Sequence, residues 1–353
     1  MTDAQRTQLI RAQITAAGER ARARHPWLAH QDLIGLGIQL GSVAGMIVTA
    51  VLYLQGMLPA WATIVIAALF ASLTHEIEHD LIHQMYFKGK PRMQNLLFLL
   101  GWLARPSTVS PWQRRDLHFH HHKRSGSASD LEERGITNGE RWGLRRLLML
   151  ADGRLAIVLR PKTIRNMLSS YVKEVDKPTS RQAWIQAMRS HSGSYWPIGT
   201  VYWTAWHAFL AYHLVDLGSR LMGQPMVWSG TVETAMSVLN PLAVCLLIPN
   251  AIRSFCLHFI SSNMHYYGDI DPGNVMHQTQ VFTHPIFWPM HLFCFNFGST
   301  HAIHHFVVGQ PFYLRQMIAP EAHDIMRKMG VRFNDLGTFQ RANRLHQLKV
   351  APH

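Results

Sequence analysis

The amino-acid sequence predicts an all-α membrane protein with four transmembrane helices and a cytoplasmic helical cap. Three observations support this prediction. Hydrophobic residues make up 48% of the 353 residues and charged residues only 16%, whereas ordinary soluble domains carry about 25% charged residues. Long segments contain no charge, and the 23 histidines include three regularly spaced clusters. This composition excludes a disordered chain, a collagen and a disulfide scaffold.

Uncharged segments give the transmembrane prediction. The first runs from Leu33 to His75 and is interrupted near its middle by Gly56 and Pro59. A bilayer span needs about 20 apolar residues, so this segment predicts two helices joined by a tight turn. Two further uncharged segments predict the third and fourth spans, and Trp and Tyr at the borders of the third suit the membrane interface. The predicted spans are 33–55, 60–81, 190–215 and 234–252.

Basic residues set the expected orientation. Five Arg lie in the first 32 residues and 20 Lys and Arg in segment 84–189, whereas the turn near Pro59 has none. Because cytoplasmic loops are enriched in Lys and Arg, we expect both termini and segment 84–189 in the cytoplasm, at a bacterial inner membrane. This bias and the attraction to lipid headgroups explain the net charge of +13. The sequence contains no nucleic-acid motif.

We expect a single domain. The N-terminal segment is polar and Arg-rich, unlike a signal peptide, and predicts an amphipathic helix on the membrane face. Segment 272–314 is uncharged but too polar for a lipid-facing span, so we expect an interfacial or inward-facing helix beneath the bundle. The expected parts are the N-terminal segment 1–32, the first two spans within 33–83, the cytoplasmic cap 84–189, the last two spans within 190–260 and a cytoplasmic segment 261–353.

Three histidine clusters have the spacing of a helix face. His75, His79 and His83 recur every four residues at the cytoplasmic end of the second span. The other two clusters repeat the pattern HxxHH, in which positions i, i+3 and i+4 share one face of a helix. They comprise His118, His121 and His122, and His301, His304 and His305. We expect His120, inside the second cluster, to point away.

These clusters predict a metal site. Neutral imidazole is the commonest side-chain metal ligand and suits iron, zinc and copper. Three clusters at one membrane face are a specific pattern, and three unrelated polar helix faces are the alternative. His265 lies just beyond the last span and can reach the same site, whereas we expect His258 to be a hydrogen-bonded interior residue. The remaining histidines, among them His346 and His353, are expected at the surface or in the core.

At these residues the chain resembles the membrane fatty acid desaturase and hydroxylase superfamily, whose members have four spans and three histidine boxes. The segment 79–83 is similar to the HDxxH of box one, and the two HxxHH clusters resemble boxes two and three. An acidic patch, 130–133, follows the second box, as in many members. His265 is similar to the family's additional ligand. The resemblance covers residues 60 to 315.

The resemblance implies a di-iron oxidoreductase that acts on a long acyl or alkyl chain. Two iron ions, with O2 as co-substrate, would remove hydrogen from an unactivated C–H bond. The electrons would come from a separate donor of the ferredoxin, rubredoxin or cytochrome b5 type, because the sequence contains no GxGxxG and no iron–sulfur cysteine pattern. The implied iron ligands are His79, His83, His118, His121, His122, His265, His301, His304 and His305.

The reaction itself stays open at this point. Fatty acid desaturation is the first choice, but oxidative decarboxylation to a terminal alkene and hydroxylation begin with the same C–H abstraction. Four basic residues flank box two and are candidates to bind a carboxylate or phosphate head group: Arg114, Arg115, Lys123 and Arg124. Contact with lipid headgroups is the alternative for these side chains. Decarboxylation would require a free carboxylate and therefore Arg114 or Arg115.

The first histidine cluster fits two overlapping motifs, HExxH at 75–79 and HDxxH at 79–83. The HEIEH sequence from His75 to His79 also fits the HExxH of alkane hydroxylases, but the FK dipeptide at 87–88 has the family spacing from His79 and His83. An intramembrane zinc metalloprotease would use His75, Glu76 and His79, with Glu76 as general base. That scheme leaves six clustered histidines unexplained. A metal transporter or metal store is a further alternative.

Acidic residues near the clusters are candidates to accept hydrogen bonds from imidazole N–H groups. Solvated helix ends are the alternative interpretation of the same residues. The candidates are Glu76, Glu78, Asp80, Asp130 and Asp269.

Overall fold

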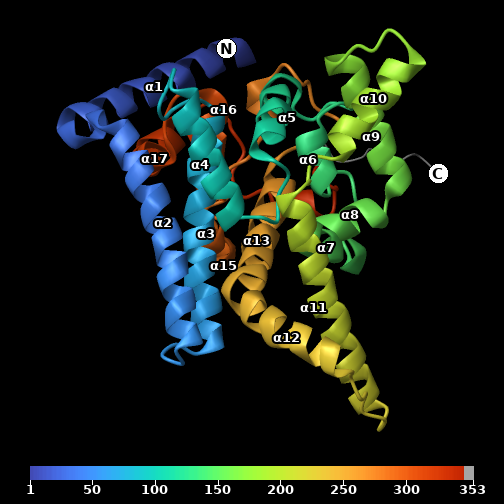
Figure 1. The fold of residues 1–353 in the computed structure, drawn as a ribbon. Helices are drawn as coiled ribbons and strands as arrows, with labels where there is room; N and C mark the ends of the chain where they lie inside the picture. The colour runs from blue at the N-terminus through green and yellow to red at the C-terminus, as the bar shows by residue number, and fades with distance from the viewer. Residues whose placement is uncertain (346–353) are drawn as a thin grey trace.

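The computed structural model describes residues 1–345, so His346 and His353 lie outside the described residues. Within this range all the regular elements are helical, and no β-strand forms (Figure 1). Two isolated bridges, His265 with Thr279 and Val281 with Phe333, are the β-type pairings found there. The all-α prediction is confirmed.

Two apolar helices, α2 (Gln31–Leu54) and α3 (Ala60–Ile82), form an antiparallel pair (Figure 1). The turn between them contains Gly56 with a φ of +73°, a left-handed conformation that glycine adopts without steric cost. Pro59 precedes α3, where its fixed φ and missing N–H are tolerated. Both helices are long and apolar enough to cross a membrane, which confirms the predicted spans 33–55 and 60–81.

A third apolar helix is continuous but bent. It consists of α12 (Gly230–Leu242), a π-helical turn (Ala243–Leu247) and α13 (Ile248–Met264). Prolines at 241 and 249 flank the π-helical turn, and both features bend helices. The 35 residues extend over about 52 Å at 1.5 Å per residue, beyond a hydrocarbon core of about 30 Å. The predicted span 234–252 lies within this helix, which extends beyond it at both ends and whose polar C-terminal part continues into the protein interior.

The bounds predicted for the remaining span, 190–215, are wrong. Residues Arg181–Ser192 form α10 and Ile198–Leu221 form α11, because Gly193 and Pro197 interrupt the segment. Among residues 1–345, three helices are long and apolar enough to cross a membrane, and α11 is not one of them. The chain is therefore a membrane protein with three such helices, and a fourth span is not confirmed.

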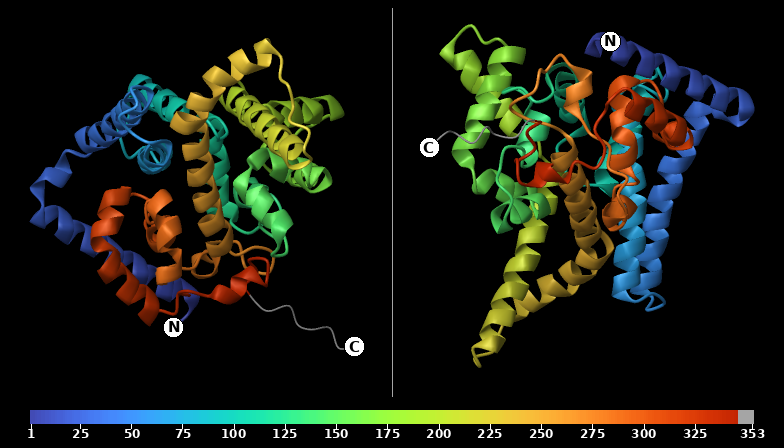
Figure 2. Two further views of the ribbon diagram at one scale, coloured as in Figure 1. Left: turned by 90° about the horizontal axis from the view of Figure 1, so that it is seen from below. Right: turned by 180° about the vertical axis from the view of Figure 1, so that it is seen from behind.

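The N-terminal helix α1 (Asp3–Arg24) packs on protein. Ile10, Ile14 and Ala17, one helical face, are buried against the hydrophobic core formed with α17 (Phe312–Lys328). Figures 1 and 2 show α17 lying directly beneath α1. The face that we expected on the membrane surface is thus covered by α17, because its apolar side chains fill a gap in the protein core.

Short helices surround the inner ends of α3 and α13. Segment 272–314, which we predicted as one helix, is broken by prolines and by the positive φ of Phe295 and Asn296 (47° and 59°). Its pieces are α14 (Val275–Gln278), a 3-10 turn (Pro285–Phe287), α15 (Trp288–Phe293) and α16 (Phe297–Phe306). The other helices are a 3-10 turn (Pro26–Ala29), α4 (Pro91–Ala104), α5 (Pro111–Arg124), α6 (Leu131–Ile136), α7 (Leu144–Ala151), α8 (Gly153–Val158), α9 (Pro161–Val175) and a 3-10 turn (Leu336–Phe339).

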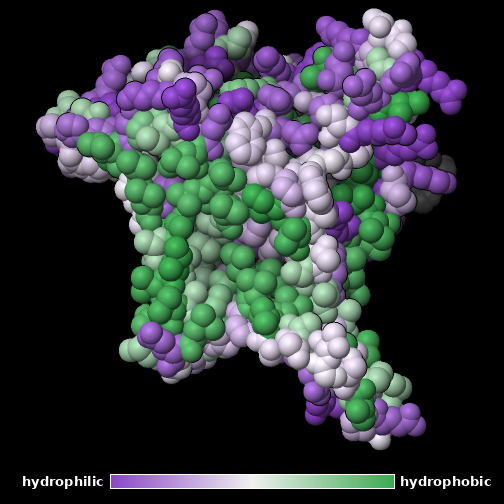
Figure 3. Space-filling model, in the orientation of Figure 1, coloured by the Kyte–Doolittle hydropathy of each residue, from purple (hydrophilic) through white to green (hydrophobic). Residues whose placement is uncertain are grey.

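The surface divides into two zones along the long helices. Figure 3 shows hydrophobic side chains over α2 and its neighbours, and hydrophilic side chains over α1, α9 and α10 at the opposite end. The exposed residues of α2 include Leu33, Leu40 and Ile47. Large contiguous apolar surfaces mark membrane contact in proteins of this kind, so the apolar zone is the membrane-facing part of the molecule.

Close packing of α2 on the residues after α3 gives a test of the fold. Gly35 lies against Tyr86, and a Cβ added there would approach the ring to 2.5 Å, whereas a Cβ at Gly37 would meet nothing within 4 Å. We expect Gly35→Ala to destabilise the protein by about 1–3 kcal/mol, the usual cost of overpacking. Gly37→Ala should be neutral or stabilising, since Ala is the better helix former by about 1 kcal/mol. Thermal unfolding in detergent measures both, and equal effects would contradict this packing.

Candidate metal centre

The three histidine clusters lie on three helices that converge. The first lies at the end of α3, the second on α5 and the third on α16. Ser110 caps α5 by accepting a hydrogen bond from the backbone N–H of Gln113, and Pro111 occupies the first turn, where it is favoured. His265 follows the last residue of α13. The structure brings together all nine histidines that we named as candidate ligands.

One group of imidazoles is centred on α3. His79, His83, His118 and His304 offer ligand atoms that all lie within 4.8 Å of one another. The Nε2 atom of His83 lies 2.9 Å from Nε2 of both His118 and His304. Nε2 of His122 closes the ring, 3.1 Å from His118 and 3.0 Å from His304.

A second group lies beside the first. His121, His265 and His305 also offer ligand atoms within 4.8 Å of one another. Nε2 of His305 lies 3.3 Å from Nε2 of both His265 and His301. The ring of His122 is 4.9 Å from both His304 and His305, centroid to centroid. His122 therefore lies between the two groups, and the nine residues form two adjacent nitrogen-rich sites.

The donor atoms fit metal ions. Four nitrogens spaced by 2.9–3.1 Å around a ring leave a point roughly 2.1 Å from each if the ring is square, which is an ordinary metal–imidazole distance. Both nitrogens of His79 and Nε2 of His121 are buried without a hydrogen-bond partner, a costly state for polar atoms. A bound cation would satisfy these atoms, and an all-imidazole set suits iron, zinc or copper.

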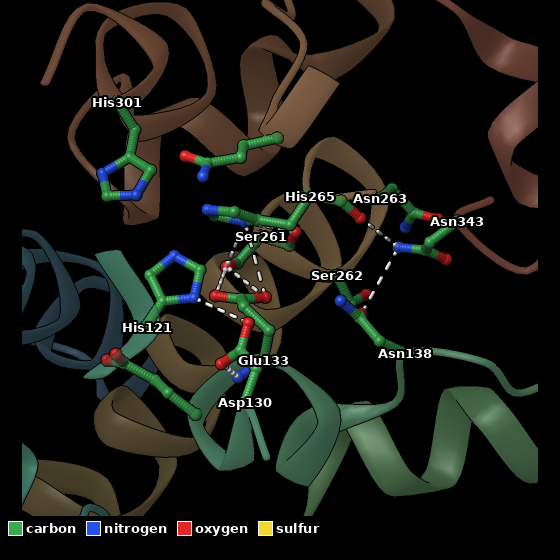
Figure 4. Close-up of polar contacts among 12 residues, drawn as sticks. His121, Asp130, Glu133, Asn138, Ser261, Ser262, Asn263, His265, His301 and Asn343 are labelled. Carbon is green, nitrogen blue, oxygen red and sulfur yellow. Dashed lines mark hydrogen bonds and ion pairs between the residues drawn. The ribbon is translucent and has the colours of Figure 1, made fainter. Parts of the chain in front are cut away.

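Outer partners orient the imidazoles of α5. Nδ1 of His118 lies 2.8 Å from Glu132, and Nδ1 of His121 lies 2.9 Å from Asp130. Figure 4 shows the second contact beside Glu133, whose carboxylate accepts a hydrogen bond from Ser261. An acceptor on Nδ1 fixes the ring and leaves Nε2 facing the centre. The candidate partner Asp130 lies where we predicted it.

Burial keeps most of these imidazoles in the neutral form that binds metals. It lowers the pKa of His118 and His122 far below the usual value, and lowers the pKa of His83 to about 2 and that of His265 to about 3. His121 differs: burial acts to lower its pKa, but the carboxylates of Asp130, Glu133 and Glu132 together outweigh burial and raise the pKa to about 9. A bound cation would displace that proton, since metal binding releases protons from its ligands.

Two acidic residues of α3, Asp80 and Glu76, pair with Arg315 of α17. Asp80 accepts hydrogen bonds from the Tyr86 hydroxyl and the Phe312 backbone N–H, both at 2.9 Å, and from Arg315 at 3.1 Å. Glu76 lies 3.5 Å from the same Arg315. These buried ion pairs fix the register of α3 against α17. Asp80 and Glu76 therefore position the helix rather than orient imidazoles directly, although Asp80 lies 3.7 Å from Nδ1 of His79.

Two other candidate acceptors for imidazole N–H groups, Glu78 and Asp269, contact other groups instead. Glu78 forms ion pairs with Arg105 and Arg114, and Asp269 accepts a hydrogen bond from the Leu345 backbone N–H. His75 belongs to neither group and lies 3.5 Å from Arg114 through Nδ1. His120 contacts Ser129 at 2.9 Å, away from both groups.

Sequence reasoning missed three outer partners. Glu132 binds His118, Glu133 lies 3.4 Å from His265, and Gln278 lies 3.1 Å from His305. Both glutamates lie in the acidic patch that the sequence had singled out, and α6 directs them toward α5 and α13. No local signal marks Gln278, because its contact depends on how the broken segment 272–314 folds back.

A cavity of about 380 Å³ adjoins the histidines. Its wall includes His79, His118 and His301, and apolar side chains from α7, α8 and α9. Arg114, a candidate head-group residue, lies in this wall. Arg115 does not line the cavity and instead stacks over Phe98 at 6.0 Å. Lys123 and Arg124 are exposed, and Arg124 pairs with Glu174. His258, expected in the interior, also lines the cavity.

The fold and the site together define an integral membrane protein with a buried polyhistidine centre beside an apolar cavity. The family model for fatty acid desaturases matches residues 56–337. The chain therefore belongs to the fatty acid desaturase family, which makes it an oxidoreductase of the desaturase or hydroxylase type with a lipid acyl substrate. No curated protein sequence matches the chain.

The buried ion pairs of α17 give a second test. We expect Arg315→Met to destabilise the protein by about 3–5 kcal/mol, because it leaves Asp80 and Glu76 as buried, unpaired carboxylates. Arg20 also pairs with a residue of α17, Glu321, but both side chains are about half exposed. Arg20→Met should therefore cost less than about 1 kcal/mol. Thermal unfolding of the two variants in the same detergent would refute the positioning role of Arg315 if they unfolded alike.

Proposed function

We propose that the nine histidines bind two iron ions and that the protein uses O2 to oxidise an acyl chain, with fatty acid desaturation as the reaction. The observation that supports this proposal is the burial of two adjacent imidazole groups against one cavity. The first iron would be held by the ring of His83, His118, His122 and His304, together with His79. The second would be held by His121, His265, His301 and His305.

The protein has three tasks in this proposal. Iron supplies the oxidation of an unactivated C–H bond with O2, as cofactors do for chemistry that side chains cannot perform. Glu132, Asp130 and Gln278 orient imidazoles through Nδ1. The cavity holds the acyl chain beside the histidines and excludes water. The buried ion pairs between α3 and α17 keep these two helices in register.

The electron donor and the orientation are part of the same proposal. A net charge of +13 would attract an acidic donor of the ferredoxin, rubredoxin or cytochrome b5 type. The basic α9 and α10 contribute to the hydrophilic end of the molecule. We place this end and both termini in the cytoplasm, since Lys and Arg are enriched there.

The zinc metalloprotease alternative meets two obstacles. His75 and His79 do not join one ligand group, and Glu76, which would act as the general base, is buried beside Arg315. A metal store or transporter would require ligands along a pathway, whereas these ligands gather at one place. Both alternatives are therefore disfavoured relative to an oxidase.

Oxidative decarboxylation is a second candidate reaction. It requires a substrate with a free carboxylate, and Arg114 in the cavity wall could meet one. Hydroxylation has no comparable observation in its favour. The three reactions differ in their products: desaturation keeps the carbon chain, hydroxylation adds an oxygen atom from O2, and decarboxylation yields a terminal alkene that is one carbon shorter.

Metal content gives the first test of the proposal. We expect two irons per chain in detergent-purified protein and a loss of at least one in His304→Ala, because His304 contributes to the four-membered nitrogen ring. His120→Ala is the matched control, since His120 lies on α5 but outside both groups, and it should retain its iron. Mass spectrometry of the metals decides between the outcomes. One zinc per chain, unaffected by His304→Ala, would contradict a di-iron centre.

Product analysis gives the second test. Iron-loaded protein, supplied with reductant, an electron donor and isotopically labelled O2, should convert dodecanoate or its thioester into the corresponding unsaturated acid or thioester, which contains no label. His304→Ala should lose at least a hundredfold of this activity and His120→Ala less than threefold. A labelled alcohol would indicate hydroxylation, and undecene would indicate decarboxylation. Product formed without O2 would rule out all three reactions.

A further inference from the structure

A buried arginine in the third apolar helix has too few partners. Arg253 is 1% exposed and donates hydrogen bonds from Nη2 to the hydroxyls of Ser107 and Ser254, at 3.0 and 2.7 Å. Its Nε and Nη1 have no hydrogen-bond partner, and no carboxylate of the described residues lies within 4 Å of it. A charged group inside a membrane helix is costly and marks function by default.

Other buried arginines of this protein show what structural burial requires. Arg146 donates to five acceptors, among them Asn263 and Asn343. Arg160 donates to the backbone carbonyls of Ala156 and of residues 134–136. Arg253 has only two neutral hydroxyls. Its surroundings therefore lack the acceptors that a purely structural guanidinium receives elsewhere in the same chain.

Further positive charge lies next to Arg253. Arg105 is buried and shares the carboxylate of Glu78 with Arg114, and its Nε has no partner. Arg114 also lies 3.6 Å from Glu132, whose other oxygen binds His118. The three guanidinium groups of Arg105, Arg114 and Arg253 therefore have two carboxylates near them. Glu78 pairs with two of the arginines, and Glu132 also contacts His118. The set has a deficit of negative charge.

This charged set forms one end of the cavity. His75, Arg105, Ser107 and Arg114 line the wall, and Ser107 joins the wall to Arg253 behind it. Nε2 of His75 is buried without a partner. The rest of the wall includes the carboxylates of Glu132 and Glu133, which contact His118 and His265, and a set of apolar side chains: Leu117, Met149, Ile157, Ile164, Leu168 and Leu257. The cavity thus combines a group of basic side chains with unused donors and an apolar surface that suits a hydrocarbon chain.

We propose that this end, lined by His75, Arg105 and Ser107 with Arg253 directly behind Ser107, binds the carboxylate of an unesterified fatty acid. The inference rests on the proposed function for the acyl nature of the substrate. A carboxylate offers the oxygen acceptors and the negative charge that the buried donors lack. A methyl ester or a thioester lacks this charge.

The position of this site sets which carbons meet the metal centre. His75 and His79 both line the cavity and are four residues apart on α3, which is about 6 Å along the axis. An acid held at His75 would therefore place the carbons nearest its carboxylate beside His79. Oxidation near the carboxyl end of the chain is the outcome that this geometry favours, and the remainder of the chain would lie along α7, α8 and α9.

Binding of labelled acid to the iron-loaded protein tests the site directly. We expect radiolabelled dodecanoate to bind purified protein on scintillation beads at least tenfold more tightly than methyl dodecanoate, because hydrogen bonds to charged groups contribute tenfold or more in affinity. Arg253→Met should weaken binding of the acid at least tenfold and leave the ester unchanged, whereas Arg253→Lys should retain most of the affinity. Arg115→Met, outside the cavity, is the control.

Stability gives a second readout for the same variant. A buried charge without a counter-ion lowers stability, so Arg253→Met should unfold at the same temperature as the unaltered protein or higher. A structural role for Arg253 would instead lower the unfolding temperature and weaken acid and ester alike. If the variant does not fold, the comparison of acid with ester on the unaltered protein still decides.

The outcomes separate this inference from the proposed function. Equal binding of acid and ester, or no binding of either, overturns the carboxylate site. Oxidation of the ester at the rate of the acid would also overturn it, while leaving an acyl-chain oxidase in place. Tight, Arg253-dependent binding of dodecanoate with no oxidised product from iron-loaded, reduced protein under O2 would refute the proposed function and leave the binding site standing.

Discussion

The burial of nine imidazoles at the end of apolar helices is the constraint on which the rest of this structure depends. Each ring has two polar nitrogens, and the interior offers little water to satisfy them. Side chains outside the centre accept hydrogen bonds from the outer nitrogens: carboxylates contact Nδ1 of His118 and His121, and an amide contacts Nδ1 of His305. The inward nitrogens contact one another and are available to a cation. Two short helices place acceptors beside the imidazoles: α6 carries Glu132 and Glu133, and α14 carries Gln278.

A second buried network keeps the histidine helices in register. Asp80 accepts from Arg315, Tyr86 and the backbone of Phe312, so one carboxylate ties α3 to the start of α17 and to the turn after α3. α17 also packs against α16, which carries the third cluster, and against α1. A shift of one residue in α3 would break these contacts and misplace His79 and His83 together. The network therefore links the geometry of the centre to the packing of the N-terminal helix.

Much of this architecture follows from periodicity in the sequence. The spacing i, i+3, i+4 puts His118, His121 and His122 on one helix face, and uncharged length places α2 and α3 to within two residues. The errors arise where local sequence is a poor guide. Segment 190–215 lacks charge but contains Gly193 and Pro197, so two helices replace one. Segment 272–314 lacks a helical period, and Gln278 reaches His305 only after the chain has folded back.

Buried charges of both signs surround the centre, and their arrangement is not visible in the sequence. Carboxylates of Asp130, Glu132 and Glu133 lie on the side of the imidazole Nδ1 atoms, where they balance the charge of a metal-loaded centre. The guanidinium group of Arg105 lines the cavity and that of Arg253 lies behind Ser107 of its wall, where both would repel a cation but attract an anion. A hydrocarbon chain alone requires neither group. A substrate that brings a negative charge would supply the acceptor that these groups lack, and the acid group of a fatty acid is the simplest one that it can bring.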